Sequence, residues 1–164
     1  MGEYSHNSHT FLPVYDENSE LLILGSFPSV KSREQGFYYG HPQNRFWKVL
    51  AAVCHCEVPQ TIEEKKSMLL NHHIAIWDVI DSCDIIGSSD SSIRNVVPAD
   101  VAGLLLKTKL NRIFVNGKTA GKLYEKFSRE STGIEAVVLP SASPANAAFS
   151  LERLIECWKR ELRL

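Results

Sequence analysis

The sequence lacks the cysteine patterns that hold metals, clusters or a disulfide framework. Its cysteines are Cys54, Cys56, Cys83 and Cys157, and they form neither a CxxC pair nor a CxxCH motif. His55 stands between two of them at a spacing that does not suit zinc, and the ligand spacings of iron–sulfur clusters are missing too. We therefore expect buried free thiols, no metal and no cofactor.

Long hydrophobic runs are also missing. No apolar run approaches the ~18 residues of a membrane span. The N-terminal stretch MGEYSHNSHTFLPVYDENSE has neither the basic start nor the apolar core of an export signal. These absences predict a cytoplasmic protein with reduced thiols and no membrane partner.

An excess of positive charge is the third absence. The 164 residues contain 18 Lys and Arg against 19 Asp and Glu, which gives a formal net charge of -1 at pH 7. Proteins that bind duplex nucleic acid normally carry a basic excess that releases counterions from phosphates. Any contact with DNA must therefore rely on helix N-termini, backbone amides and a local basic cluster.

Four short apolar runs are present and mark the fold. They cover residues 21–25, 74–77, 113–115 and 136–139, and each is followed by turn-forming residues. Unbroken apolar runs of this length are typical of parallel strands that are covered on both faces.

Helical patterns, each with one apolar stripe, lie between these runs and at the end of the chain. They follow Pro42, Pro98 and Gly117, span residues 61–71 and occupy residues 151–162. Pro42 and Pro98 suit the first turn of a helix, and Thr61 with Glu64 forms a capping-box pattern.

The alternation of strands and helices predicts an α/β protein. We expect a three-layer α/β/α sandwich around a short, mainly parallel four-stranded sheet. Residues 1–164 should form a single domain, in which residues 1–20 are a polar N-terminal segment without a predicted role.

Ligands of such folds bind outside the carboxyl ends of the strands. The loops that begin at Gly25, Asp78, Asn116 and Pro140 should therefore share one cleft. After GSFPS, the first loop combines cationic, aromatic and amide side chains, which suit phosphates and a stacked base. It lacks the GxGxxG of a dinucleotide site, and the later NGKT stretch lacks the first glycine of a phosphate loop, because Arg112 stands there.

The same loop is part of a longer signature. The run GSFPSVKSREQGFYYGHPQNRFWKVL, residues 25–50, resembles the first motif region of the mismatch-specific uracil- and thymine-DNA glycosylases. Together with IWDVIDSCD and LPSASPANA, it is most similar to the hypoxanthine-DNA glycosylase (DNA-deoxyinosine glycosylase) branch of the uracil-DNA glycosylase superfamily. The resemblance implies a base excision repair enzyme that flips deoxyinosine out of DNA and hydrolyses its N-glycosidic bond.

One position of the signature departs from the mismatch-specific group. Where those enzymes have an asparagine that positions the attacking water, this sequence has Phe27, which cannot polarise water. The hypoxanthine branch implies Asn44, within HPQNRFW, as the catalytic residue; a helix-capping or loop-bracing role is the alternative. Neither Lys31 nor Lys118 stands in a context that singles out a lyase nucleophile. We therefore expect a monofunctional enzyme that leaves an abasic site.

The resemblance also implies the residues of the base pocket. Tyr39 aligns with the aromatic residue that stacks on the flipped base, and Phe27 would form the opposite wall, although either could belong to the core. Ser26 lies in the same loop, and Asp78 would contact the base edge or the water unless it caps a turn. Leu139 replaces a polar residue that helps uracil to depart in other branches, which favours a purine leaving group.

Contacts to DNA are expected from polar side chains around this pocket. The candidates are Ser29, Lys31, Lys118, Ser141 and Ser143. The expected partner is DNA that contains a deaminated base, bound by a monomer. Two other functions stay open, because two familiar catalytic positions are apolar: a mismatch-specific uracil- or thymine-DNA glycosylase, and a non-catalytic DNA- or nucleotide-binding module of the same fold.

Overall fold

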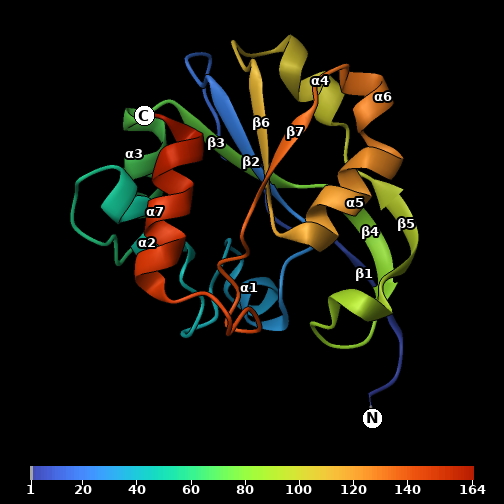
Figure 1. The fold of residues 1–164 in the computed structure, drawn as a ribbon. Coiled ribbons are helices and arrows are strands. Elements are labelled where there is room, and N and C mark those ends of the chain that lie inside the picture. The colour runs from blue at the N-terminus through green and yellow to red at the C-terminus, as the bar shows by residue number, and fades with distance from the viewer. Residues whose placement is uncertain (1) are drawn as a thin grey trace.

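A four-stranded parallel sheet forms the centre of the structure, a computed structural model that describes residues 2–164. Its strands lie in the order β3-β2-β6-β7 (Figure 1). They are β2 (Leu21–Gly25), β3 (Ile74–Asp78), β6 (Arg112–Asn116) and β7 (Ala136–Leu139). These strands coincide with the four apolar runs, so the predicted sheet is confirmed.

Helices cover both faces of this sheet (Figure 1). One side holds α2 (Phe46–Val53), α3 (Ile62–Asn71) and α7 (Leu151–Leu162), and the other holds α4 (Val101–Leu106), α5 (Lys118–Phe127) and α6 (Arg129–Thr132). Successive strand side chains point to opposite faces, so Leu21 and Ile23 pack in the first layer and Leu22 and Leu24 in the second. The three-layer α/β/α sandwich is therefore confirmed.

The sequence does not predict the second sheet. It is antiparallel, in the order β1-β4-β5, and consists of β1 (Ser5–Ser8), β4 (Ile80–Ile85) and β5 (Arg94–Pro98). Both β1 and β5 are largely exposed, so neither shows an apolar run. Pairing of Ser5 with Ile85 joins distant parts of the chain, which local patterns do not reveal. The short helices α1 (Val30–Gln35) and η1 (Asp90–Ser92) are likewise unpredicted.

Two of the predicted helix starts are wrong. Pro42 lies in a turn before α2, which begins at Phe46, and Pro98 ends β5 before α4 begins. Side chains rather than prolines start these helices: the Asp100 carboxylate accepts a hydrogen bond from the Gly103 N–H at 3.0 Å. The capping box at the start of α3, with Thr61 as its N-cap, is confirmed.

The polar N-terminal segment runs along the edge of the central sheet. Val14 and Ile76 of β3 exchange two backbone hydrogen bonds of 3.0 Å. The Tyr38 hydroxyl donates to the Leu12 carbonyl oxygen at 2.9 Å. The segment therefore has a structural place, next to the strand that ends at Asp78.

Loops and the short helix α1 gather at the carboxyl ends of the parallel strands, below the sheet in Figure 1. The helices that cover the two faces of the sheet lie beside and above this region (Figure 1), so they leave these strand ends free for a binding site. Within residues 2–164, no helix has the length and apolar character needed to cross a membrane.

Candidate active site

A cavity of about 340 Å³ lies at the carboxyl ends of the parallel strands. Gly25 of β2, Asp78 of β3, Asn116 of β6 and Ser141 after β7 all line it. The prediction that the four loops share one cleft is thus confirmed. The volume is at the lower end of the range for small-molecule sites, ~300–1,000 Å³, which suits a single base better than a large cofactor.

Gly25 shapes the floor of the cavity. It pairs with Asp78 across β2 and β3, and a Cβ atom on it would lie 2.5 Å from Asp78 Oδ1 and 3.0 Å from the Tyr39 hydroxyl oxygen. Both distances are shorter than ordinary van der Waals contact. Glycine is therefore needed here for the close approach of a carboxylate and a hydroxyl to one point.

Asp78 is nearly inaccessible to solvent and is paired with a histidine. Its residue exposure is 3%, and His9 Nε2 lies 2.8 Å from Asp78 Oδ2. In the described part of the chain, no backbone N–H donates to this carboxylate, so the alternative that Asp78 caps a turn finds no support. The sequence does not point to His9, which lies in the polar segment that has no predicted role.

Two aromatic side chains form walls of the cavity. Tyr39 stacks on Phe46, with ring centroids 3.9 Å apart and planes 12° apart, and it adopts a positive φ of 53°. Its hydroxyl is buried and has no hydrogen-bond partner among the described residues. Phe27, 8% exposed, lines the cavity and packs on the cluster that contains Ile80 and Cys83.

A second carboxylate lines the cavity. Asp90 of η1 accepts a hydrogen bond from Ser26 Oγ at 3.0 Å. Although Asp90 is an exposed residue, its carboxyl group lies close to protein atoms. This partial removal from water raises the pKa of Asp90, the Asp78 charge adds to the rise, and the Ser26 hydrogen bond opposes it.

Asn44 is placed next to the cavity lining rather than in it. Its backbone N–H donates to the His41 carbonyl at 3.0 Å, and His41 does line the cavity. The Asn44 Oδ1 atom accepts the Phe46 N–H at 2.9 Å, at the start of α2. This bond corresponds to the helix-capping alternative, and it satisfies one of the free N–H groups of a helix start.

Arg45 ties this segment to the loop after β7. Its guanidinium donates to the carbonyl oxygens of Ser143 at 2.8 Å, of Asn146 at 3.0 Å and of Phe149. Its backbone N–H donates to the Ala142 carbonyl at 3.0 Å. One planar cation therefore fixes the loop that brings Ser141 and Ser143 to the cavity.

The candidate DNA-binding residues fall into two groups. Ser29, Ser141 and Ser143 line the cavity. Lys118 lies in an adjoining cleft that shares Ser141 and Ser143, whereas Lys31 is exposed and 3.6 Å from Glu34, outside both linings. The structure thus brings three of the five to the cavity and a fourth to its border.

Comparison with known proteins identifies the family. A family model described as the uracil DNA glycosylase superfamily matches residues 12–161. The chain belongs to the uracil DNA glycosylase superfamily. The resemblance predicted from the sequence is therefore confirmed.

Three relatives within this superfamily resemble the chain over most of its length. A Methanosarcina acetivorans protein named hypoxanthine DNA glycosylase is 41% identical over 155 residues, 93% of this chain and 96% of the relative. A Methanosarcina barkeri protein of the same name is 34% identical over 138 residues, 83% and 86% of the two chains. A solution NMR structure from Methanosarcina acetivorans, assigned to the uracil DNA glycosylases, has a TM-score of 0.79 at 39% identity and covers 93% of this chain and 94% of that chain.

Two residues of this glycosylase site were missed by sequence reasoning. Asp90 stands within GSSDSS, which has the composition of a solvated turn, and His9 reaches Asp78 only through a long-range strand pairing. The location of Asn116 in the site, by contrast, can be predicted, because this residue ends a parallel strand. Its Oδ1 atom accepts the Ala142 N–H at 3.0 Å. Local composition can find residues at strand ends, but not those delivered by a distant segment.

Proposed function

We propose that this protein is a hypoxanthine DNA glycosylase, which removes hypoxanthine from deoxyinosine in DNA as the first step of base excision repair. The observation that supports it most is the 41% identity, across nearly the whole chain, to a protein of that name. The cavity adds independent support, because it is of base size and has aromatic walls and a polar floor.

The target base is buried in the duplex stack, so it must rotate out of the helix to reach the cavity. Rotation favours mispaired bases, which unstack easily. Tyr39 already has Phe46 on one face, and we assign its other face to the flipped base. Phe27 would then close the pocket from the side.

Cleavage of the N-glycosidic bond passes through a sugar with oxocarbenium character. The enzyme has to direct a water molecule at the anomeric carbon and stabilise positive charge there. We assign the water to Asn44, whose Oδ1 atom is engaged once by the Phe46 N–H but keeps a second lone pair. Carboxylates at Asp78 and Asp90 supply negative potential on the cavity side.

The departing base is the other half of the reaction. Leu139 is fully buried in the core, so it offers no side-chain hydrogen bond to a leaving pyrimidine. A purine can be stabilised by protonation on its imidazole ring, and therefore depends less on such help. This difference favours hypoxanthine over uracil as the substrate.

Hydrolysis without a covalent intermediate is the simplest scheme for this site. None of the residues that line the cavity in the described chain is a lysine, and a lyase step requires an amine nucleophile. We therefore propose a monofunctional enzyme that leaves an abasic site.

DNA would approach across the border of the cavity. We assign contacts with DNA phosphates near the flipped base to Ser29, Ser141 and Ser143. Lys118 and Lys31 would contact phosphates farther along the DNA strand. Such contacts position the duplex without reading its sequence. We further propose that the protein acts as a monomer in the cytoplasm.

The test is excision from one set of labelled duplexes that contain deoxyinosine, deoxyuridine, deoxyxanthosine or thymine in mismatches. Alkali-labile sites should form fastest at deoxyinosine, and no strand break should appear before alkali treatment. Preferential cleavage at uracil or thymine would instead assign the mismatch-specific function. Binding without any alkali-labile product at high enzyme concentration would identify a non-catalytic module.

A further inference from the structure

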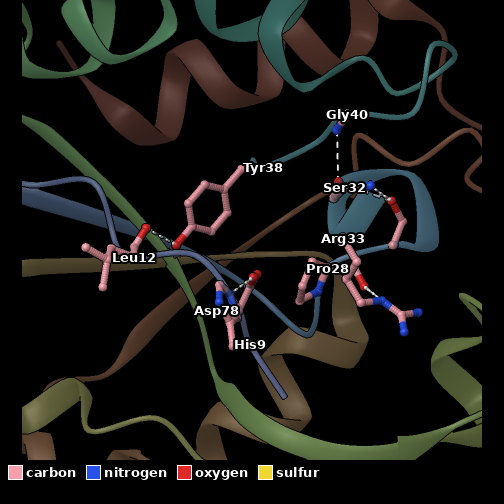
Figure 2. A network of polar contacts seen from close by, with 9 residues as sticks. His9, Leu12, Pro28, Ser32, Arg33, Tyr38, Gly40 and Asp78 are labelled. Atoms are coloured by element: carbon pink, nitrogen blue, oxygen red, sulfur yellow. Dashed lines mark hydrogen bonds and ion pairs between the residues drawn. The ribbon is translucent and has the colours of Figure 1, made fainter. Parts of the chain in front are cut away.

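His9, which pairs with the Asp78 carboxylate, has no part in the hydrolysis described above. Figure 2 shows the imidazole pointing at the carboxylate, with the Nε2 to Oδ2 distance of 2.8 Å. Both side chains are almost completely buried, with exposures of 2% and 5%. Burial of a polar pair from water is costly unless hydrogen bonds of good geometry compensate for it.

Several contacts fix His9 in this position. Its backbone N–H donates to the Asp81 carbonyl at 2.6 Å, and the strand before it pairs with β4. On the other side, the Tyr38 hydroxyl holds the Leu12 carbonyl oxygen at 2.9 Å (Figure 2). The N-terminal segment therefore delivers one imidazole to the underside of the cavity floor.

The surroundings of His9 favour one tautomer of its ring. Its Nδ1 atom is buried without a hydrogen-bond partner in the described chain, and the ring packs against the rings of Phe11 and Tyr38 at centroid distances of 4.6 Å and 5.7 Å. An N–H on Nδ1 would be buried there without an acceptor. The tautomer with its proton on Nε2 fits this environment, because that N–H donates to Asp78 Oδ2 at 2.8 Å.

The second oxygen of Asp78 is free for a ligand. Oδ1 has no hydrogen-bond donor within residues 2–164, and it lies beside Gly25 at the cavity floor, near the hydroxyl end of Tyr39. An ionised carboxylate oxygen only accepts hydrogen bonds. A base stacked on the Tyr39 ring would present one edge to this oxygen.

We propose that Asp78 Oδ1 accepts the N1–H of the flipped hypoxanthine and that His9 is the positioning residue that holds the carboxylate in the required orientation. This inference rests on the proposed function and specifies how the site selects its base. Hypoxanthine and other lactam purines have a donor at N1. Adenine has a lone pair at the same position, which a carboxylate repels.

The pair would therefore reject the normal base from which deoxyinosine arises. Selection by one buried polar group is effective, because the wrong base leaves that group unpaired in a site without water. A hydrogen bond to a charged group contributes enough to change binding about 10- to 100-fold when it is lost.

The experiment compares binding of two duplexes that resist cleavage, which contain 2′-fluoroarabino-inosine or 2′-fluoroarabino-adenosine. Dissociation constants from fluorescence anisotropy give an inosine-to-adenosine preference, and single-turnover assays give excision of hypoxanthine. Asp78→Asn should reduce the preference about 10- to 100-fold, because an amide can pair with adenine as well. His9→Ala should reduce it about tenfold, and His9→Gln, which keeps an N–H donor, should recover most of it.

His6→Ala is the matched control. His6 lies on β1 and bonds to Asp84 at 2.9 Å, but its side chain is 63% exposed. This variant should keep the wild-type preference, and thermal melts should show that all four variants fold. If His9→Ala does not fold, His9→Gln and a modified substrate test the proposal instead. N1-methyl-deoxyinosine lacks the N1–H donor, so the wild type should excise its base about 10- to 100-fold more slowly than hypoxanthine.

The outcomes separate two failures. A wild-type protein that excises hypoxanthine, with an unchanged preference in Asp78→Asn and His9→Ala, overturns the role of the pair and leaves the proposed function intact. A wild-type protein that neither excises hypoxanthine nor prefers inosine overturns the proposed function, and the inference with it.

Discussion

Replacement of Arg45 tests whether the loop after β7 depends on a single cation. The guanidinium donates hydrogen bonds to three carbonyl oxygens, those of Ser143, Asn146 and Phe149. The Ser143 and Asn146 oxygens also accept backbone N–H groups, at 3.0 Å and 3.4 Å. Arg45→Ala removes all three hydrogen bonds. Arg45→Lys keeps the charge but replaces a planar fork with one compact ammonium group, which cannot serve three acceptors in this arrangement.

The expected magnitude follows from these bonds. A hydrogen bond to a charged group contributes ~1.5–3 kcal/mol, but the three are not additive, because the loop is partly exposed and its freed carbonyls can bind water. We expect Arg45→Ala to lower the free energy of unfolding by about 2–4 kcal/mol and Arg45→Lys by about 1–2 kcal/mol. Ser141 and Ser143 would then lose their fixed position, so affinity for duplex DNA should also fall.

Urea denaturation of both variants measures the first effect, and fluorescence anisotropy with a duplex containing deoxyinosine measures the second. Arg153→Ala is the control, because this exposed arginine contacts the same loop only through a hydrogen bond of 3.4 Å to the Ala148 carbonyl and a cation–π contact of 4.4 Å with the Phe149 ring. Its unfolding free energy should change by no more than ~1 kcal/mol. If Arg45→Ala and Arg153→Ala lower the unfolding free energy and the DNA affinity equally, the Arg45 hydrogen bonds are not what holds the loop.

Three further predictions concern the cavity floor and the thiols. Gly25→Ala would place its Cβ atom 2.5 Å from Asp78 Oδ1, so single-turnover excision should fall at least ~100-fold; near-normal excision would show that the floor adapts. Tyr39→Phe removes a buried hydroxyl without a partner, so urea melts should show unchanged or up to ~1 kcal/mol higher stability, and a clear loss of stability would contradict this. Burial raises the pKa of the Cys54 thiol to about 12, and Cys56 is exposed. At pH 8 a thiolate-specific disulfide reagent should therefore modify Cys56 first and Cys54 only after denaturation, and equal rates in the folded protein would refute the assignment.

The central sheet can be predicted from the sequence because buried parallel strands carry an unmistakable local pattern. The runs at β2 and β3 are apolar throughout and short, and they end in turn residues. The position of the cleft follows from the same four runs, since parallel strands align their carboxyl ends. The sequence alone therefore predicts that Gly25, Asp78 and Asn116 lie in one cleft, and all three line the cavity.

The antiparallel sheet and its contribution to the site cannot be predicted in this way. β1 is polar and mostly exposed, and its pairing with β4 is specified by contacts between segments far apart in the chain. His9 therefore carries no local signal of its partnership with Asp78. Prolines mislead for a different reason: Pro98 fits a helix start, but it can also end an edge strand, as it does in β5.

The most direct test of the proposed chemistry is single-turnover excision of hypoxanthine from a deoxyinosine–thymine duplex by the wild type and Asn44→Ala. Loss of the bond to the Phe46 N–H should destabilise the fold by only ~1 kcal/mol, so the variant should remain folded and still bind the duplex. We expect rapid excision by the wild type and a rate at least ~1,000-fold lower for Asn44→Ala, because the interaction of Asn44 with the water is made mainly in the transition state. Near-wild-type excision by a folded Asn44→Ala protein would contradict this role.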